Sequence, residues 1–309
     1  MFFADMHCDT ITNLMDNARS LRNNVLQVDL EKLSRFSAPL QFFAIWLEPQ
    51  YYHCAYKKTC DYIRFFYDEV EKNHELIGAV KNTAEIQANR QDGKISALLS
   101  IEGGECLEGK VERIGELYES GIRAFSLTWN NDNVLACGCN TNMDTGLTGL
   151  GREAVEQIGE LGMLLDLSHC SERTFWDIAD MHKKPLIASH SNTKALRKHQ
   201  RNLDDKQLRA IADRGGVVGI TLFSEFLTYN KRATMDEIIS HIDHVVQVAG
   251  VDHVGFGCDF EGMVVTPIEI ETVADMSVLA EKICAHFGSA AGEKILGGNV
   301  LRILNDIVN

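Results

Sequence analysis

Residue types that bind metal ions end several short apolar runs of this sequence. His7 and Asp9 follow the first run, Glu102 follows a later one, and His169 and His190 close two successive runs. Imidazole nitrogens and carboxylate oxygens are common ligands of divalent metals such as zinc. Side chains at the ends of parallel strands meet at the C-terminal mouth of a (β/α)8 barrel, where such barrels build their active sites. The pattern therefore predicts a metal-dependent hydrolase.

Each of these residues also has a simpler interpretation. An isolated His-x-Asp such as His7-Cys8-Asp9 is usually a surface pair, a carboxylate such as Glu102 can form a salt bridge or cap a helix, and a single His after an apolar run is often a core residue. We favour ligands, because a carboxylate buried at the end of an apolar strand is costly unless it is paired or bound to metal. A carboxylate can also bridge two cations, and two His residues, each preceded by Ser, end successive runs.

Two further positions are candidates for acting on a substrate. Asp259 ends the last apolar run, within Gly-Phe-Gly-Cys-Asp-Phe-Glu-Gly, whose small residues indicate that something approaches the backbone there. Near a metal-bound water, Asp259 could carry a proton from the nucleophile to a leaving amine; it could also be one more ligand, or hold a His in place. Arg201 and Asn202 follow the sixth run, and an Arg at the mouth of an anionic site suits a substrate carboxylate.

The elements that must position these residues can be read from hydrophobic spacing. Eight runs rich in Val, Ile, Leu and Phe are mostly apolar on both faces, as buried parallel strands are; they are Phe2–His7, Leu40–Leu47, Ile95–Glu102, Ile122–Trp129, Met163–His169, Pro185–His190, Gly216–Phe223 and His253–Asp259. Apolar residues three and four apart predict amphipathic helices between the runs, over Tyr62–Glu71, Val111–Glu119, Arg152–Leu161, Glu172–Met181, Asp205–Asp213 and Met235–Val248.

Strands that alternate with helices in this way favour a closed (β/α)8 TIM-type barrel, an α/β fold, over an open sheet. Local signals agree: Asp204 or Asp205 can cap the helix that begins there, and Thr234 with Glu237 fits a capping box. We expect residues 1–309 to form a single barrel domain, with C-terminal helices from about residue 270 packed on its outside.

Composition excludes several classes of partner. The net charge of −14 argues against binding to nucleic acid or to an anionic membrane surface, since phosphate partners need a basic protein.

No apolar stretch reaches the ~18 residues of a membrane span, and no signal peptide is visible in the first residues. The nine Cys residues show no framework spacing, so we expect reduced thiols in a cytoplasmic protein.

Taken together, these residues resemble the membrane (renal) dipeptidase family of dinuclear zinc peptidases, within the amidohydrolase-like barrels. The resemblance runs nearly from end to end of the chain and keeps its order. It is carried by Asp5-Met-His7-Cys-Asp9, Ile101-Glu102-Gly-Gly, Ser126-Leu-Thr-Trp-Asn130, Asp166-Leu-Ser-His169, Ser189-His190-Ser-Asn, Arg201-Asn202-Leu, Val254-Gly-Phe-Gly-Cys-Asp259-Phe-Glu-Gly and Gly298-Asn299-Val-Leu-Arg302.

The resemblance implies two divalent metal ions per subunit, with zinc the expected metal. It places His7 and Asp9 on one ion and His169 and His190 on the other, with Glu102 bridging the two. A hydroxide held between the metals would be the nucleophile. Relatives of this kind are often homodimers, which makes a homodimer a candidate assembly.

The resemblance also assigns residues to the substrate. It implies that Asp259 carries the proton and that Arg201 grips the C-terminal carboxylate of a dipeptide, with Asn202 beside it. Trp129 departs from the mammalian-type members, which carry a His there that helps to hold the tetrahedral oxyanion; an indole N–H could replace it in part, and bacterial-type members share this feature. At a position near Phe223, the family has a Tyr whose hydroxyl donates a hydrogen bond to the substrate carboxylate. Phe cannot donate that bond.

The sequence therefore predicts a metallodipeptidase that cuts dipeptides with a free C-terminal carboxylate, including those with a D-residue at that position. One alternative is another amidohydrolase-like barrel hydrolase, acting on N-acyl amino acids, cyclic amides or lactones. A second is a catalytically silent metal-binding scaffold, which the joint presence of all five ligand candidates and Asp259 disfavours.

Overall fold

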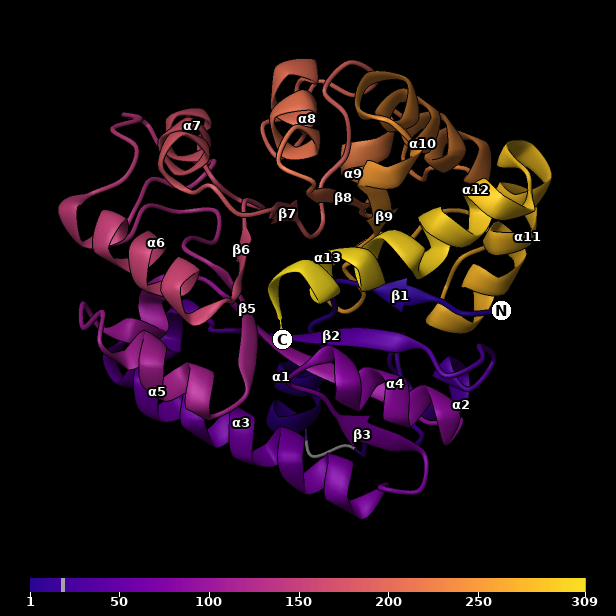
Figure 1. The fold of residues 1–309 in the computed structure, drawn as a ribbon, viewed down its shortest axis with the longest axis horizontal. Coiled ribbons are helices and arrows are strands. Elements are labelled where there is room, and N and C mark those ends of the chain that lie inside the picture. The colour runs from indigo at the N-terminus through magenta and orange to yellow at the C-terminus, as the bar shows by residue number, and fades with distance from the viewer. Residues whose placement is uncertain (18–19, 309) are drawn as a thin grey trace.

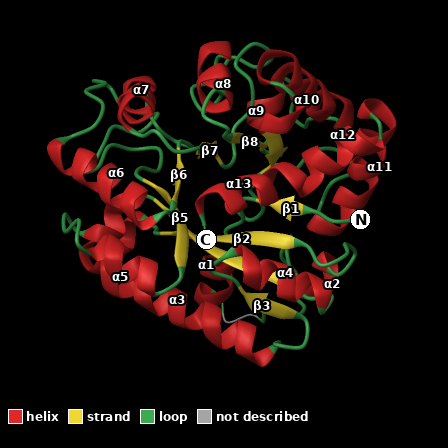
Figure 2. Ribbon diagram, in the orientation of Figure 1, coloured by secondary structure: helices red, strands yellow, loops and turns green. Residues whose placement is uncertain are grey.

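Eight parallel strands close into a ring in the computed structural model of the protein, which describes residues 1–17 and 20–308. Helices surround this ring (Figures 1 and 2). Around the ring the strands follow one another in the order β2 (Leu40–Trp46), β1 (Ala4–Asp5), β9 (Val254–Phe256), β8 (Val217–Ile220), β7 (Leu186–Ala188), β6 (Leu164–Asp166), β5 (Ile122–Ser126) and β4 (Ile95–Glu102). Pairing of β4 with β2 closes the circle, which confirms the predicted (β/α)8 barrel.

All strands of the ring except β4, which matches its run, are shorter than the apolar runs that predicted them. In the run that ends at His169, only Leu164–Asp166 (β6) forms a strand. In the run that ends at Asp259, only Val254–Phe256 (β9) does. Beyond these strands the backbone turns, and His169 and Asp259 adopt left-handed φ angles of 66° and 68°. The prediction that both residues end a strand is therefore wrong, because a left-handed residue cannot continue the extended ladder. They lie in tight turns just beyond the strands.

One strand was absent from the prediction. β3 (Ile77–Ala79) pairs with Ile95–Ala97 at the start of β4. It occupies the side of β4 that β5 reaches only from Leu99 onward. Three residues, one of them a glycine, are too few to show a strand pattern in the sequence.

The six predicted helices are all present; five agree with their expected ends to within three residues, but α3 (Ala55–Lys72) begins at Ala55, seven residues before the predicted start at Tyr62. Asp204 caps its helix in a capping box with Gln207, and Thr234 does the same with Glu237. The α-helices of the described residues are α1 (Thr10–Asp16), α2 (Leu30–Leu33), α3 (Ala55–Lys72), α4 (Thr83–Gln91), α5 (Arg113–Glu119), α6 (Gly149–Leu161), α7 (Glu172–Met181), α8 (Asp205–Ala212), α9 (Ser224–Leu227), α10 (Met235–Ala249), α11 (Met276–Phe287), α12 (Ser289–Glu293) and α13 (Asn299–Ile307).

The last helix closes one end of the barrel. In Figure 1, α13 lies across the middle of the ring of strands. Its buried Val300, Ile303 and Leu304 pack with interior residues of the strands such as Leu98 and Leu164. A larger apolar core fills the space between the strands and the outer helices. The opposite end of the barrel, where the strands finish, is left to the candidate site. None of the helices in the described part of the chain is long and apolar enough to span a bilayer.

Candidate metal centre

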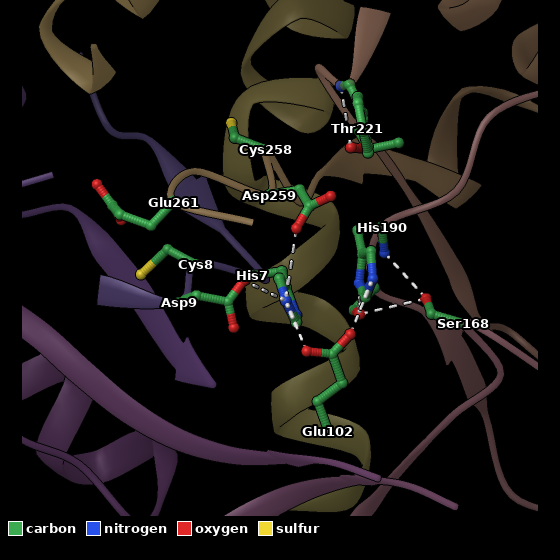
Figure 3. A network of polar contacts seen from close by, with 12 residues as sticks. His7, Cys8, Asp9, Glu102, Ser168, His190, Thr221, Cys258, Asp259 and Glu261 are labelled. Carbon is green, nitrogen blue, oxygen red and sulfur yellow. Dashed lines mark hydrogen bonds and ion pairs between the residues drawn. The ribbon is translucent and has the colours of Figure 1, made fainter. Parts of the chain in front are cut away.

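Two distant parts of the chain run side by side at the open end of the barrel. Beyond β1 and β9 the backbones remain paired, since Asp259 N donates to His7 O over 3.1 Å and Asp9 N donates to Phe260 O over 2.9 Å. This pairing brings His7, Asp9 and Asp259 together (Figure 3). The Nε2 atom of His7 lies 3.7 Å from Asp9 Oδ2 and 3.8 Å from Asp259 Oδ1.

The carboxylate of Glu102, the last residue of β4, stands between two groups of nitrogens. Its Oε2 lies 3.6 Å from His7 Nε2. Its Oε1 lies 2.7 Å from His169 Nε2 and 3.5 Å from His190 Nε2. Each oxygen thus faces a different group, as a carboxylate that bridges two ions would.

The two imidazoles of His169 and His190 present bare nitrogens to each other. The Nδ1–H of His169 donates to Asn130 Oδ1 over 2.8 Å. The Ser189 hydroxyl donates to Asp166, so it accepts at 2.8 Å from the Nδ1–H of His190. Both Nε2 atoms therefore carry lone pairs, and they are only 2.8 Å apart. Two lone pairs that face each other at this distance call for a cation between them.

Other donor atoms of the centre are also without partners. His7 Nε2 and Asp9 Oδ1 are buried and form no hydrogen bond within the described residues. Buried polar atoms of this kind are rare unless water or an ion satisfies them. Two sets of ligand atoms, each within 4.8 Å of one another, share His7: one adds Glu102 and His190, the other Asp9 and Asp259. Nitrogen and carboxylate donors in this arrangement fit divalent ions.

Burial and mutual charge shift the pKa of each group. Burial alone would raise the pKa of Glu102, but the neighbouring imidazoles of His7 and His169 outweigh it and hold that pKa well below its usual range. Burial lowers the pKa of His169 to about 4, which keeps this ring neutral. Burial raises the pKa of Asp259 to about 8; His7 opposes this shift, and the carboxylates of Asp9 and Glu102 add to it.

A cavity of about 630 Å³ opens onto these residues. Its polar lining is made of Asp9, Asn13, Glu102, Asn130, His169, Asp259 and Glu261, and its apolar side chains are all aromatic, namely Trp46, Trp129, Phe223 and Phe226. The ring of Trp129 lies 5.1 Å from that of Trp46 and 6.3 Å from that of His169, measured between centroids. Trp129 is therefore part of the wall beside the metal centre, as is Phe223.

Arg201 and Asn202 lie behind the centre. Arg201 faces a second cavity, of about 730 Å³, which His169 also borders. Its Nη2 donates to His190 O over 3.1 Å, while its buried Nε has no partner among the described residues. The Asn202 amide donates to the carbonyls of Arg197, Phe226 and, more weakly, Thr193. The structure thus brings the five predicted ligands and Asp259 together. Arg201 contacts the backbone of the ligand His190 instead of joining this group, and the contacts of Asn202 hold a loop.

Comparison with known proteins places the chain in a family. The sequence model of the membrane dipeptidase family, peptidase family M19, matches residues 1–309. The chain belongs to the membrane dipeptidase family. This confirms the resemblance drawn from the motifs, and it makes the chain a metallodipeptidase, a metal-dependent hydrolase of peptide bonds.

Relatives and solved structures agree with this membership. An uncharacterized dipeptidase of Schizosaccharomyces pombe is 32% identical over 295 residues, which cover 89% of this chain and 71% of the relative. A dipeptidase of family M19 has the same fold, with a TM-score of 0.93 at 24% identity over 100% of this chain and 99% of its own. A metallopeptidase from Rhodobacter sphaeroides, solved with a phosphinate mimic of the dipeptide L-Ala-D-Ala, gives a TM-score of 0.91 at 24% identity and covers 99% of both chains.

The sequence motifs did not reveal several contacts of this M19 peptidase. Asn130, Asp166 and Ser189 hold the rings of the two histidines. Glu261 accepts hydrogen bonds from the Thr10 hydroxyl and from two backbone N–H groups of the N-terminal segment. Asp166 did leave a signal, because a charged residue inside the apolar stretch Leu-Leu-Asp-Leu is costly to bury unless it is hydrogen-bonded.

Proposed function

We propose that the protein is a dinuclear metallodipeptidase that hydrolyses dipeptides with a free C-terminal carboxylate, including those with a D-residue at that position. The observation that carries this proposal is the position of Glu102, whose two oxygens face His7 on one side and the pair of His169 and His190 on the other. A single ion held by His7, Glu102 and His190, one of the two ligand sets, would leave the other set, which adds Asp9 and Asp259 to His7, without a metal.

His7 and Asp9 would hold one ion, His169 and His190 the other, and Glu102 both. Histidine and carboxylate donors suit zinc, which is the expected metal. Two divalent ions, when bound, lower the pKa of a water molecule and polarise the peptide carbonyl. The protein holds these donors in place by burial, since each of the five residues is at most 7% exposed.

The remaining side chains act on protons and on the substrate. Asp259 borders the cavity 3.8 Å from His7 Nε2, and from there it can take a proton from the nucleophile and return it to the leaving amine. Trp129 lines the wall next to His169, where its indole can contact the reacting carbonyl. Arg201 supplies a buried cation on the far side of His169, suited to a carboxylate.

Support for a D-residue comes from the Rhodobacter sphaeroides neighbour, which was solved with a mimic of L-Ala-D-Ala. The fold of the two proteins is the same, although the identity is only 24%. An aromatic cavity beside the metal centre gives room for an apolar N-terminal side chain in this protein.

A substrate panel tests the proposal. The purified protein, loaded with Zn²⁺, Mn²⁺ or Co²⁺, is assayed on L,L- and L,D-dipeptides, on their C-terminal amides and on N-acyl amino acids. We expect turnover of the dipeptides with a free carboxylate, with two metal ions per chain by elemental analysis. Turnover of the N-acyl compounds alone would reject the proposal in favour of another barrel hydrolase.

A further inference from the structure

A single buried carboxylate ties together the turns that carry His169 and His190. Oδ1 of Asp166, at the end of β6, accepts the backbone N–H of Ser168 over 2.9 Å and that of Ser189 over 2.8 Å. Its Oδ2 accepts the hydroxyl of Ser189. Asp166 is only 6% exposed, so these bonds replace nearly all of its contact with water.

The hydroxyl of Ser189 links this carboxylate to the ring of His190 in the metal centre. A serine hydroxyl has one proton, and Ser189 gives it to Asp166. Its oxygen must therefore accept from the ring of His190, whose Nδ1 lies 2.8 Å away. The proton of His190 is thereby fixed on Nδ1, and the lone pair of Nε2 points at Glu102 Oε1, 3.5 Å away.

The turn that contains Ser189 has little freedom to move. Its backbone carbonyl packs against Gly219 of β8 and Gly257 just after β9, where a Cβ atom would come within 1.9 Å and 1.7 Å of the carbonyl oxygen. Gly257, one of the small residues before Asp259, thus makes room for this turn. Ser189 therefore holds its place whether or not the bond to His190 is formed.

The two imidazoles differ in what supports them. His190 is supported through Ser189 by a carboxylate, but the partner of His169 is the neutral amide of Asn130, whose oxygen also accepts from the thiol of Cys139 over 3.2 Å. A carboxylate behind a metal-binding imidazole fixes the tautomer and raises the basicity of the ligand, and such partners affect metal affinity strongly.

We propose that Asp166, acting through Ser189, is a positioning residue that fixes the tautomer of His190 and so sets the affinity of the ion held by His169 and His190. The inference rests on the proposed function, because it assumes that His190 binds metal. It gives Asp166 a role beyond joining two turns.

Replacement of Asp166 by Asn separates these two roles. Oδ1 is held by two N–H donors, so the amide nitrogen of Asn has to take the place of Oδ2. That nitrogen donates, which forces the Ser189 hydroxyl to turn and donate to Nδ1 of His190. The proton of His190 then moves to Nε2 and blocks the metal, while both turns keep their backbone hydrogen bonds.

The experiment measures zinc affinity and the histidine tautomer in Asp166→Asn, in Ser189→Ala and in Asp29→Asn. Asp29 is a matched control, because it is also buried and accepts backbone N–H groups, at the N-terminus of α2. Zinc occupancy is followed by elemental analysis across a series of buffered free Zn²⁺ concentrations. The ¹⁵N shifts of the His190 ring are recorded on the metal-free proteins and assigned with His190→Gln.

We expect Asp166→Asn to bind one of its two ions about 10- to 100-fold more weakly than the wild type, and Ser189→Ala about 10-fold more weakly. In metal-free Asp166→Asn, the ring of His190 should carry its proton on Nε2. Asp29→Asn should bind zinc as the wild type does.

The inference is overturned if Asp166→Asn and Ser189→Ala hold both ions with wild-type affinity, or if the His190 proton stays on Nδ1 in Asp166→Asn. Should Asp166→Asn fail to fold, Ser189→Ala alone decides by its zinc affinity. If the wild-type protein itself binds no zinc, the proposed function fails first; if it binds two ions and the variants do likewise, only the inference fails.

Discussion

The Nε2 atoms of His169 and His190 lie 2.8 Å apart, although each ring already donates its only proton to a partner of its own. Burial lowers the pKa of both imidazoles, so neither ring gains a second proton near neutral pH to relieve the contact. A bound cation would convert this repulsion into two coordinate bonds. Folding and metal binding should therefore be coupled in this protein.

Metal removal should lower the stability of the protein. An ion present at 100 times its dissociation constant adds about 2.7 kcal/mol to the free energy of unfolding. We expect a chelator to lower Tm and to abolish hydrolysis, and added Zn²⁺ to restore both. In the double variant His169→Ala/His190→Ala, the chelator should change Tm much less. A wild-type Tm that does not change when the chelator is added would contradict the coupling of folding to metal binding.

Asp259→Asn should separate metal binding from hydrolysis. Asn has nearly the same shape as Asp but cannot carry a proton, so kcat should fall by about 10²- to 10⁴-fold. The metal content should remain that of the wild type, because the five proposed ligands are unchanged. Elemental analysis and dipeptide assays on the same preparation check both statements. Unchanged turnover would remove Asp259 from the mechanism.

Arg201→Ala should affect substrates according to their C-terminal group. A hydrogen bond to a charged group is worth about 1.5–3 kcal/mol, so kcat/KM for a dipeptide should fall by about 10- to 100-fold. The same dipeptide with an amidated C-terminus should lose little. Arg201 also donates to His190 O, and Arg201→Lys, which keeps the charge, serves as the control. Equal losses on both substrates would mean that Arg201 holds the His190 turn and does not bind the carboxylate.

The ring of strands could be predicted because buried parallel strands leave long apolar runs, and the ligands because polar residues end those runs. The turns that orient the ligands could not. The left-handed backbone at His169 and Asp259 leaves no periodic pattern in the sequence. Neither position is a glycine, the residue that would have indicated a left-handed turn. The partner of His169 is Asn130, 39 residues earlier in the chain, and only the closed barrel brings the two together.

His182 shows the same limit outside the site. It directly follows the last residue of α7, where the apolar spacing of that helix gives no sign of a buried ring, yet it is only 6% exposed. Gly159 of α6 explains the difference, because a Cβ atom there would lie 3.1 Å from the His182 ring. A glycine on a neighbouring helix makes room for this imidazole, and spacing within one helix cannot reveal such a contact.

Glu261 should stabilise the rim of the cavity. Its Oε1 accepts the backbone N–H groups of Gln27 and Val28 over 2.7 and 2.9 Å, and its Oε2 accepts the Thr10 hydroxyl. Glu261→Ala leaves these donors without their acceptor and should lower the free energy of unfolding by roughly 2 kcal/mol. Glu269→Ala is a matched control, since Glu269 has the same left-handed φ of 68° but is exposed. Urea denaturation of both variants measures the difference, and equal effects would refute the role of Glu261.

His241 of α10 should make the stability of the protein depend on pH. It is 1% exposed; its Nδ1 accepts the Thr193 N–H over 3.1 Å, and its Nε2–H donates to Leu227 O over 3.0 Å. Burial lowers the pKa of His241 to about 4; the Leu227 carbonyl opposes this shift, nearby His244 adds to it and Glu237 opposes it.

The direction of the pH effect follows from this lowered pKa. In the unfolded chain His titrates near 6.5, so the folded state favours the neutral ring. The resulting stability is fully present above pH ~6.5 and is lost as the pH falls toward 4, by up to about 3 kcal/mol. Gln at this position keeps an acceptor and a donor but does not titrate. We therefore expect His241→Gln to be less stable than the wild type at pH 7 and the difference to shrink as the pH falls to 4, as measured by urea denaturation. A difference that stays constant over this range would show that His241 does not cause the pH dependence.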